Sequence, residues 1–459
     1  MASSCSGSRR GDVDMTQGSV VGHLIQFALP MCIGLVFQQL YNTVDTIVVG
    51  QFVGKEALAA VGSTGPVLNT FVGLATGLSV GSTVLVSQCY GAHDQKRLKN
   101  VVHTTIMLTV ILSAFMTLAG VLLVEPLLRV MDTPEDVFAS AGKYLRIYLA
   151  GVSGLLFYNM GSGILRAVGD SRRPLWFLVI SAVLNTVFDL LFVVVFQLGV
   201  AGVAYATILA QWISALLVMI TLCREPSAYG VRLRQLRLDV PTMRNILSIG
   251  LPAAVQAVLI SFTNVFVQAY INYFGSAAMA GWSAYNKLDA FLMIPMQALA
   301  TAATTFVGQN YGANDLPRAR RGVNTSLVLC CATTAVLAVL VMLFAGPCMR
   351  LFTSDPDVIA YGVRFVYISS PFYVPVCLNT VYASVLRSVG NTKGPMIILI
   401  FSYMVVRHVY LYIAKMLGNN LEAIALGYPI GWLVAGLLLY LAYRRSVLFR
   451  TKEQPQAAA

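Results

Sequence analysis

Long apolar runs alternate with short polar segments along almost the whole chain. At about 1.5 Å of rise per helical residue, each run is long enough to cross the hydrocarbon layer of a membrane. None shows the alternation of apolar and polar positions over about ten residues that is typical of a membrane β-barrel. The pattern therefore predicts an all-α membrane protein with twelve transmembrane helices, at about residues 24–51, 58–86, 100–124, 140–166, 174–197, 200–223, 247–273, 278–306, 324–346, 359–386, 395–416 and 421–443.

Composition agrees with this pattern and excludes a soluble protein. Hydrophobic residues make up 57% of the 459 residues, charged residues make up only 11%, and the mean hydropathy is +0.74. A soluble fold could not bury so much apolar surface. The net charge of +12 could suggest nucleic-acid binding, but the excess lies in loops between the apolar runs. We therefore expect a lipid bilayer as partner and no nucleic acid.

The signs of the loop charges indicate an orientation. Every second loop is poor in Lys and Arg, and acidic residues such as Glu125 and Asp355 lie in loops of this kind, whereas the other loops are rich in basic residues. Because loops rich in Lys and Arg stay in the cytoplasm, both termini are expected there. The basic segments contain Lys96, Arg97, Lys99, Arg166, Arg172, Arg173, Arg224, Arg232, Arg234, Arg237, Arg244, Arg318, Arg320, Arg321, Arg387, Lys393, Arg444 and Arg445.

The two halves of the chain repeat one another. The segment VSQCYGAHD (86–94) returns as VGQNYGAND (307–315), and LRAVGDSRRP (165–174) returns as LRSVGNTKGP (386–395). The repeat predicts six-helix bundles at 24–223 and 247–443, a cytoplasmic linker at 224–246, and cytoplasmic tails at 1–23 and 444–459. Because six is even, the repeat is parallel, and a substrate cleft is expected between the bundles. Residues 1–14, before Met15, are expected to be dispensable.

Three carboxylates lie deep inside apolar runs: Asp45, Asp189 and Asp289. From the helical rise, Asp45 lies roughly 8–9 Å below the outer end of its run, Asp189 roughly 11 Å and Thr207 roughly 10 Å. Asn185 lies one turn before Asp189, on the same helix face. Asp45, Asn185, Asp189 and Thr207 are therefore predicted to form one polar pocket in the first bundle.

This pocket has the chemistry of a cation-coupling site. Two adjacent carboxylates in a low-dielectric medium resist double ionisation, so one of them is expected to hold a proton. The same carboxylate, amide and hydroxyl oxygens would suit Na⁺. The alternative is that each Asp caps a helix end or bonds a neighbouring backbone group. No Cys-x-x-Cys pair and no cluster of His and Cys is present. No structural metal site and no cofactor is therefore expected, only H⁺ or Na⁺ as coupling ion.

The second bundle has different polar residues in its apolar runs. It contains Asn264, Lys287, Asp289 and Arg407, and no acid at the repeat positions of Asp45 and Asp189. Buried charges of opposite sign usually pair, which favours an ion pair of Asp289 with Arg407 or Lys287. The alternative is a polar patch that faces the cleft and contacts substrate.

Several motifs together resemble the multidrug and toxic compound extrusion (MATE) transporters, most closely their DinF-like prokaryotic branch. They are LYNTVDTIVVGQFVGKEALAAVG (40–62), SQCYGAHD (87–94), ILRAVGDSRRP (164–174), LNTVFD (184–189) and GQNYGAND (308–315). The resemblance covers about residues 15–445. It implies a V-shaped pair of bundles in a bacterial inner membrane that exports cationic, amphipathic drugs in exchange for H⁺ or Na⁺.

The resemblance implies that the residues that couple cation binding to transport in this family correspond to Asp45, Asn185, Asp189 and Thr207. These are the same four residues that their predicted depth in the membrane had brought together. The resemblance adds Tyr41 beside the first acid and Pro30 as the point where the first helix bends. It implies a monomer and no enzymatic activity. A second cation site of the kind that some members build in the other half is not expected, because its acids are absent here. The walls of the cleft are predicted at Gln38, Tyr41, Asn42, Tyr158, Asn159, Asn264, Lys287, Asp289 and Arg407.

Two alternatives remain open at the level of the sequence. Related two-bundle proteins flip lipid-linked sugars, and Lys287 and Arg407 would suit a pyrophosphate cargo. An intramembrane protease is suggested only by the short pattern Gly151-Val152-Ser153-Gly154. A serine nucleophile needs a positioned base, and His408, the one histidine deep inside a run, lies in the other half.

Overall fold

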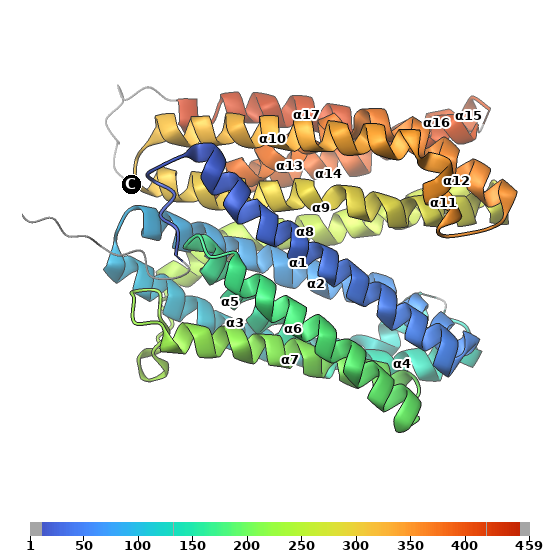
Figure 1. Cartoon of the computed structure of the whole chain (residues 1–459), viewed down its shortest axis with the longest axis horizontal. Coiled ribbons are helices and arrows are strands. Elements are labelled where there is room, and N and C mark those ends of the chain that lie inside the picture. The colour runs from blue at the N-terminus through green and yellow to red at the C-terminus, as the bar shows by residue number, and fades with distance from the viewer. Residues whose placement is uncertain (1–11, 132, 419, 450–459) are drawn as a thin grey trace, which may run out of the picture. The chain divides into compact units, whose positions relative to one another are not determined.

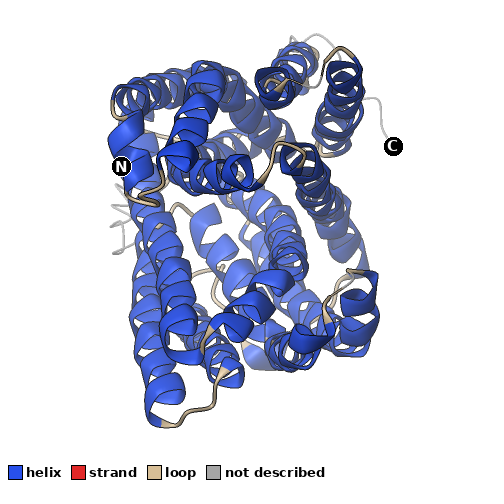
Figure 2. Ribbon diagram, turned by 90° about the vertical axis from the view of Figure 1, so that its right-hand side faces the viewer, coloured by secondary structure: helices blue, strands red, loops and turns tan. Residues whose placement is uncertain are grey.

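The computed structural model describes residues 12–131, 133–418 and 420–449, and within these ranges it contains helices and loops but no strand (Figure 2). The predicted all-α class is therefore confirmed. Most of the segment 1–14 that we expect to be dispensable, and the end of the C-terminal tail, lie outside the described residues. The helices are labelled in Figure 1.

The chain divides into two compact units, which we describe separately. Unit 1 contains the described residues up to Met15 together with Gln26–Ser261, and unit 2 contains Thr16–Ile25 and the chain from Phe262 onward. The elements up to the unit boundary are α1 (Val20–Val48), η1 (Val49–Val53), α2 (Lys55–Gly91), α3 (Gln95–Val130), α4 (Glu135–Ala150), α5 (Val152–Ala167), α6 (Arg172–Asp189), η2 (Leu190–Val195), α7 (Val200–Arg224), η3 (Leu233–Gln235) and α8 (Val240–Asn272).

The division between the units falls inside α8, after Ser261, whereas the sequence repeat places it in the linker 224–246. The predicted bundle and linker boundaries therefore remain predictions. The elements that follow α8 are α9 (Ser276–Gly312), α10 (Leu316–Leu343), α11 (Ala345–Arg350), α12 (Pro356–Ser369), η4 (Ser370–Phe372), α13 (Tyr373–Ser388), α14 (Lys393–Ile400), η5 (Phe401–Val406), α15 (Arg407–Met416), α16 (Leu421–Ala425), α17 (Gly427–Arg444) and η6 (Val447–Phe449).

Two of the twelve predicted spans are broken within the membrane-spanning region. Ten described helices are long and apolar enough to cross a membrane, and the bent pair α4–α5, with an angle of 43°, supplies an eleventh. The predicted span 359–386 is divided into α12, η4 and α13. Pro371 and Pro375 explain this break, because proline removes a backbone donor and disfavours the preceding helical turn. The two breaks, at Gly151 and Phe372, are equivalent positions of the repeat.

The repeated motif near residues 90 and 311 forms a tight turn between two helices. His93 and Asn314 adopt positive φ angles of 53° and 59°. The next residue in each copy, Asp94 or Asp315, caps the following helix by accepting a hydrogen bond of 2.9 Å from the backbone N–H three residues later. Such side-chain caps satisfy the unpaired N–H groups of a helix start. The motif therefore builds the connections α2–α3 and α9–α10.

Small residues allow the helices of unit 1 to pack closely. A Cβ atom on Gly163 of α5 would lie 2.6 Å from Ser79 Oγ of α2, and one on Gly77 would lie 2.3 Å from Ala254 Cα of α8. Gly73 and Gly81 lie one turn to each side of Gly77 and also face α8. Stripes of small residues are typical of membrane helices in close contact. The first part of α8 therefore packs on α2 and belongs to unit 1.

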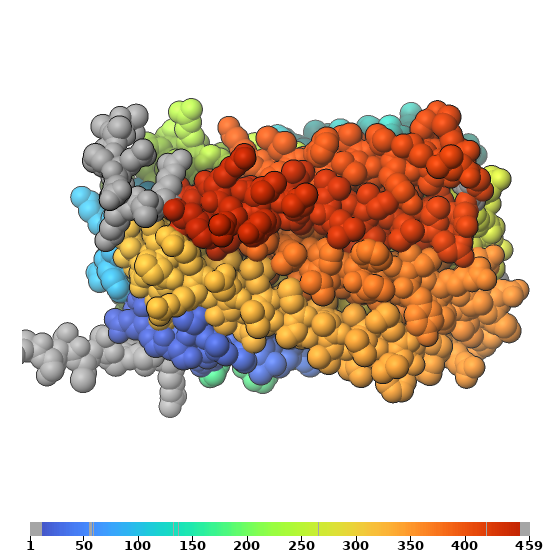
Figure 3. Space-filling view, turned by 90° about the horizontal axis from the view of Figure 1, so that it is seen from above, coloured from blue at the N-terminus to red at the C-terminus, as the bar shows by residue number. Residues whose placement is uncertain are grey.

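Unit 2 is built around α9, which packs against α10, α12 and α13, while α13 also packs against α17. Its core is rich in aromatic rings, and Trp282 of α9 contacts Phe365 of α12 and Tyr428 of α17 at centroid distances of 4.9 and 5.3 Å. One face of this unit shows the C-terminal helices, in red, lying along the orange elements that precede them (Figure 3).

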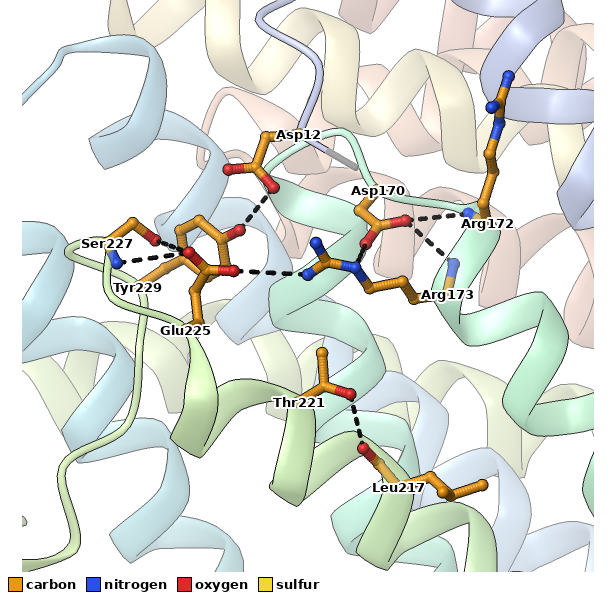
Figure 4. Close-up of polar contacts among 9 residues, drawn as sticks. All are labelled: Asp12, Asp170, Arg172, Arg173, Leu217, Thr221, Glu225, Ser227 and Tyr229. Carbon is orange, nitrogen blue, oxygen red and sulfur yellow. Dashed lines mark hydrogen bonds and ion pairs between the residues drawn. The ribbon is translucent and has the colours of Figure 1, made fainter. Parts of the chain in front are cut away.

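A polar cluster fixes the turn between α5 and α6 at the basic end of unit 1 (Figure 4). The Asp170 side chain is fully buried and accepts hydrogen bonds from the backbone N–H groups of Arg172 and Arg173, at 3.1 and 3.0 Å. The Arg173 guanidinium pairs with Asp170 at 3.2 Å and reaches Glu225 at 3.5 Å. Burial raises the pKa of the Asp170 carboxyl group, and Arg173 partly opposes that rise.

We expect Arg173→Ala to destabilise the protein by about 1–3 kcal/mol at pH 7, because it leaves a buried carboxylate without its cation. The Asp170 pKa is expected to rise further in this variant. A carboxyl group whose pKa is higher in the folded state binds more protons when folded, so acid stabilises the fold. The deficit relative to wild type should therefore shrink from pH 7 to pH 5, as thermal unfolding in detergent would show.

Arg172→Ala is the matched control for this prediction. The exposed Arg172 side chain points away from Asp170, and only its backbone N–H contacts the carboxylate (Figure 4). We expect its unfolding temperature to remain close to that of wild type. Equal losses in both variants would show that the guanidinium of Arg173 does not stabilise Asp170.

Candidate functional site

Asp45 and Asp189 meet in unit 1. Asp45 lies in the last turn of α1 and Asp189 is the last residue of α6, and the two carboxyl groups are close enough to interact electrostatically. Asp189 is fully buried, whereas Asp45 is half-buried. The helical rise had predicted a shared depth, and the structure adds that the two helices turn these residues toward one another.

A π-helical segment follows each of the two acids. η1 begins four residues after Asp45, η2 begins directly after Asp189, and the two segments contact each other. A π-helical turn contains an extra residue, so it rotates the side chains that follow it, and such turns are frequent at functional sites. The sequence carries no signal for them, because VGQFV and LLFVVV are compatible with a continuous α-helix.

The polar groups around the acid pair lack hydrogen-bond partners within the described part of the chain. Such atoms are Asp45 Oδ1, both carboxylate oxygens of Asp189, and both side-chain atoms of Asn185, which is 1% exposed. Thr207 is also buried, and its hydroxyl donates to the Val203 carbonyl oxygen at 2.9 Å, which leaves its lone pairs able to accept. An unpaired buried polar group costs about 1–3 kcal/mol. The arrangement is therefore suited to a proton or cation that would bridge these oxygens.

Three tyrosines surround the pair, and only Tyr41 was selected from the sequence. Tyr41 and Tyr144 lie close enough to both carboxylates to interact with them electrostatically, and Tyr148 interacts with Asp45. The Tyr148 hydroxyl accepts a hydrogen bond of 3.1 Å from Gln211 Nε2 of α7. The spacing of Tyr144 and Tyr148, one turn apart on α4, was the signal that could have identified them.

A cavity of about 60 Å³ adjoins the site. It is large enough for a few water molecules but too small for a drug-sized compound. Among its lining residues are Gln38, Tyr41, Tyr158, Thr207 and Gln211. Tyr41 and Thr207 therefore connect the predicted coupling residues with a small cavity inside unit 1.

The other residues predicted for the first half of the cleft have local partners. The Asn159 amide donates to the Leu155 carbonyl oxygen at 2.9 Å, and the Asn159 carbonyl oxygen accepts a hydrogen bond from Ser79 at 2.7 Å. These bonds join α5 to itself and to α2. Asn42 is exposed. Pro30 lies inside α1, which continues on both sides of it.

The polar residues of unit 2 do not form the expected ion pair. Asp289 accepts a hydrogen bond from the Tyr373 hydroxyl, and Lys287 is exposed. The buried Arg407 donates to Asn264 Oδ1 at 3.3 Å and lies 4.1 Å from the ring centroid of Tyr428. Within the described residues, no ion pair joins Asp289 to Arg407 or Lys287.

The aromatic residues around Asp289 and Arg407 explain why these two side chains do not form an ion pair. Ring faces attract a guanidinium without a carboxylate, and a tyrosine hydroxyl can satisfy a carboxylate oxygen without a cation. Arg407 lies between the rings of Tyr428 and Tyr403, the latter at 5.0 Å. Asp289 and Arg407 therefore each interact with tyrosine side chains instead of with each other.

Comparison with known proteins gives consistent matches over nearly the whole chain. The sequence model of the MatE family matches residues 30–191 and again residues 252–413. A Bacillus subtilis protein called "Probable multidrug resistance protein YpnP" is 30% identical over 438 residues, which cover 94% of this chain and 96% of that protein. The "FAD transporter" of Shewanella oneidensis is 26% identical over 390 residues, or 82% of this chain and 84% of that protein.

A solved structure shows the same fold. It is described as an outward-facing conformation of a multidrug resistance MATE family transporter of the MOP superfamily. The superposition has a TM-score of 0.89 at 26% sequence identity and covers 95% of this chain and 98% of that one. The double match of the family model agrees with the internal repeat in the sequence.

Proposed function

We propose that this chain, which belongs to the MatE family of multidrug transporters, is an antiporter that exports cationic, amphipathic compounds in exchange for H⁺ or Na⁺. The observation that carries this proposal is the group of Asp45, Asn185 and Asp189, in which Asp45 Oδ1, both Asp189 carboxylate oxygens and the Asn185 side-chain amide have no hydrogen-bond partner among the described residues. In a transporter, such a group is suited to bind and release a cation during each cycle.

The proposed cycle follows from the repulsion between adjacent carboxylates. When both Asp45 and Asp189 are ionised they repel, and a proton or Na⁺ between them removes that repulsion. Because η1 begins one turn after Asp45 and η2 begins directly after Asp189, a change in the spacing of the acids would be passed to the ends of α1 and α6. We propose that cation binding and release in this way bias the two states of an alternating-access cycle.

Several finer features belong to the same proposal. We propose a DinF-like transporter that is monomeric and has both termini in the cytoplasm of a bacterial cell. We also propose that α1 bends at Pro30 and that the cargo contacts Gln38, Tyr41 and Tyr158. The Gly151–Gly154 pattern is explained by packing, since these glycines contact Ile208 and Trp212 of α7.

Drug uptake into everted membrane vesicles tests the proposed function. Ethidium accumulation should follow an imposed pH gradient if the coupling ion is H⁺, and an imposed Na⁺ gradient if it is Na⁺. Vesicles without the protein are the control. If neither gradient drives accumulation of ethidium or of another cationic dye, this chain is not a cation-coupled exporter of such compounds.

A second candidate cargo is an anionic flavin nucleotide. The relative called "FAD transporter" and the buried Arg407, which has no carboxylate partner in the described chain, favour it. Export of FAD in the same vesicles, with ethidium as competitor, distinguishes the two cargoes. Flipping of lipid-linked sugars remains a third alternative, and a fluorescent lipid-linked sugar in the same vesicles would test it.

A further inference from the structure

A cavity of about 750 Å³ lies at the basic end of unit 1, between the start of α3 and the segment that joins α7 to α8. Five basic residues line it: Lys96, Arg97 and Lys99 from α3, and Arg234 and Arg237 from the joining segment. A smaller cavity of about 380 Å³ shares Lys96 and Lys99 and adds Arg232. Two segments that are far apart in the sequence therefore place their positive charges around the same cavity.

The acidic residue that lines the cavity does not neutralise this charge. Asp94 caps α3, and its carboxylate accepts a hydrogen bond of 2.9 Å from the Arg97 backbone N–H. Within the described residues, none of the five basic side chains forms an ion pair with a carboxylate. All five are exposed to solvent. Like charges that converge in this way repel one another, and an anion between them would remove the repulsion.

The joining segment is tied to α3 at both ends of the cavity. The Arg232 backbone N–H donates to His103 Nε2 at 3.1 Å, and the opposite ring nitrogen of His103 bonds the Lys99 carbonyl oxygen at 2.7 Å. At the other end, the Asp239 backbone N–H donates to Thr104 Oγ1 at 3.3 Å. Asp239 also caps α8, and hydrogen bonds from Thr242, with a smaller contribution from the charge of Arg237, lower the pKa of its carboxyl group. Little ordering of this segment would therefore be required on binding.

Membrane orientation alone does not account for this geometry. The rule for loop charges requires an excess of Lys and Arg on one side of the membrane. It does not require residues from two segments to line one cavity whose walls are hydrogen-bonded together. Exposed residues such as Arg224, at the end of α7, and Arg244, near the start of α8, satisfy the rule without lining either cavity.

We propose that this cavity binds a phosphate-bearing anion. A guanidinium group can donate two hydrogen bonds to the oxygens of one phosphate. Lysine ammonium groups are compact positive charges that can neutralise a second phosphate. The volume exceeds that of a single phosphate ion, so the ligand carries more than one phosphate or a phosphate with an attached group. Such chemistry has two sources at a membrane surface: the headgroup of an anionic phospholipid, or a soluble polyphosphate compound.

Binding to the purified full-length protein in nanodiscs tests the proposal and separates the two sources. In one arm, tripolyphosphate is titrated by calorimetry into protein in pure phosphatidylcholine nanodiscs. In the other, delipidated protein is mixed with cardiolipin and with phosphatidylcholine, and retained lipid is counted by native mass spectrometry. The variant Arg234→Ala/Arg237→Ala is compared with the control Arg224→Ala/Arg244→Ala, which removes the same charge from the same region.

The wild-type protein is expected to bind tripolyphosphate or to retain cardiolipin selectively. The cavity variant should weaken that binding by at least about tenfold, with little change in the control variant. Because all four substituted residues are exposed, both variants should unfold at the wild-type temperature. Binding in the first arm assigns a soluble ligand, and selective retention in the second arm alone assigns a lipid headgroup. Equal weakening in both variants, or no binding of either probe by wild type, overturns the proposal.

Discussion

Asp45→Asn and Asp189→Asn are each expected to reduce gradient-driven drug export by at least about tenfold, which corresponds to about 1.4 kcal/mol in the rate-limiting barrier. Each substitution keeps the shape of the side chain but removes its ability to exchange a proton. Transport into everted vesicles, normalised to the amount of folded protein, measures the effect. Because the two carboxyl groups face each other, we expect them to act as one unit.

That expectation makes the double variant informative. Groups that act as a unit show strongly non-additive effects, so Asp45→Asn/Asp189→Asn should be little worse than either single variant. Glu125→Gln is the matched control, because Glu125 of α3 is half-exposed and pairs with the equally exposed Arg146 of α4. Exposed ion pairs contribute about 0–1 kcal/mol. Normal pH- and Na⁺-driven export by both single variants would contradict the proposed coupling site.

Gly77→Ala is expected to destabilise the protein by about 1–3 kcal/mol, the usual range for overpacking a tight contact. The added Cβ would lie 2.3 Å from Ala254 Cα and 2.4 Å from Ala254 N. These are backbone atoms of α8, so no side-chain rotation can relieve the clash. The change should appear as a lower unfolding temperature in detergent and a smaller folded fraction in size-exclusion chromatography.

Gly62→Ala on the same helix is the control, and it should move stability in the opposite direction. Nothing lies within 4 Å of a Cβ at Gly62, and replacing a helical glycine by alanine stabilises a helix by roughly 0.5–1 kcal/mol. The pair therefore separates helix propensity from packing. Equal stability of the two variants would show that α2 and α8 are not in close contact at Gly77.

Regular helix geometry predicted part of the arrangement around Asp45 and Asp189. Helical rise placed Asp45 and Asp189 at one depth, and the one-turn spacing placed Asn185 on the face of Asp189. Both inferences depend only on regular geometry along one helix. Tyr144 and Tyr148 were missed because depth alone does not say which helix is the neighbour, and α4 reaches the acids only through the packing of unit 1.

Arg407 shows why the pairing of charges in unit 2 was predicted wrongly. Opposite charges in apolar runs suggest an ion pair, and the sequence offered Asp289 as partner. Rotation of the helices instead places Asn264 and the rings of Tyr403 and Tyr428 around Arg407, and Tyr373 beside Asp289. The hydrogen-bonding and ring contacts of a tyrosine depend on that rotation, which hydrophobic periodicity does not specify.

The sequence by itself determined the membrane class, the internal repeat and the depth of Asp45. Long apolar runs, their spacing and the cost of a carboxylate in hydrocarbon do not depend on how helices pack. The tertiary structure decided which groups meet at that depth, where η1 and η2 interrupt the helices, and how residues near Lys96 and Arg234 come to share one cavity. These features arise from helix rotation and from contacts between distant segments, which no local pattern encodes.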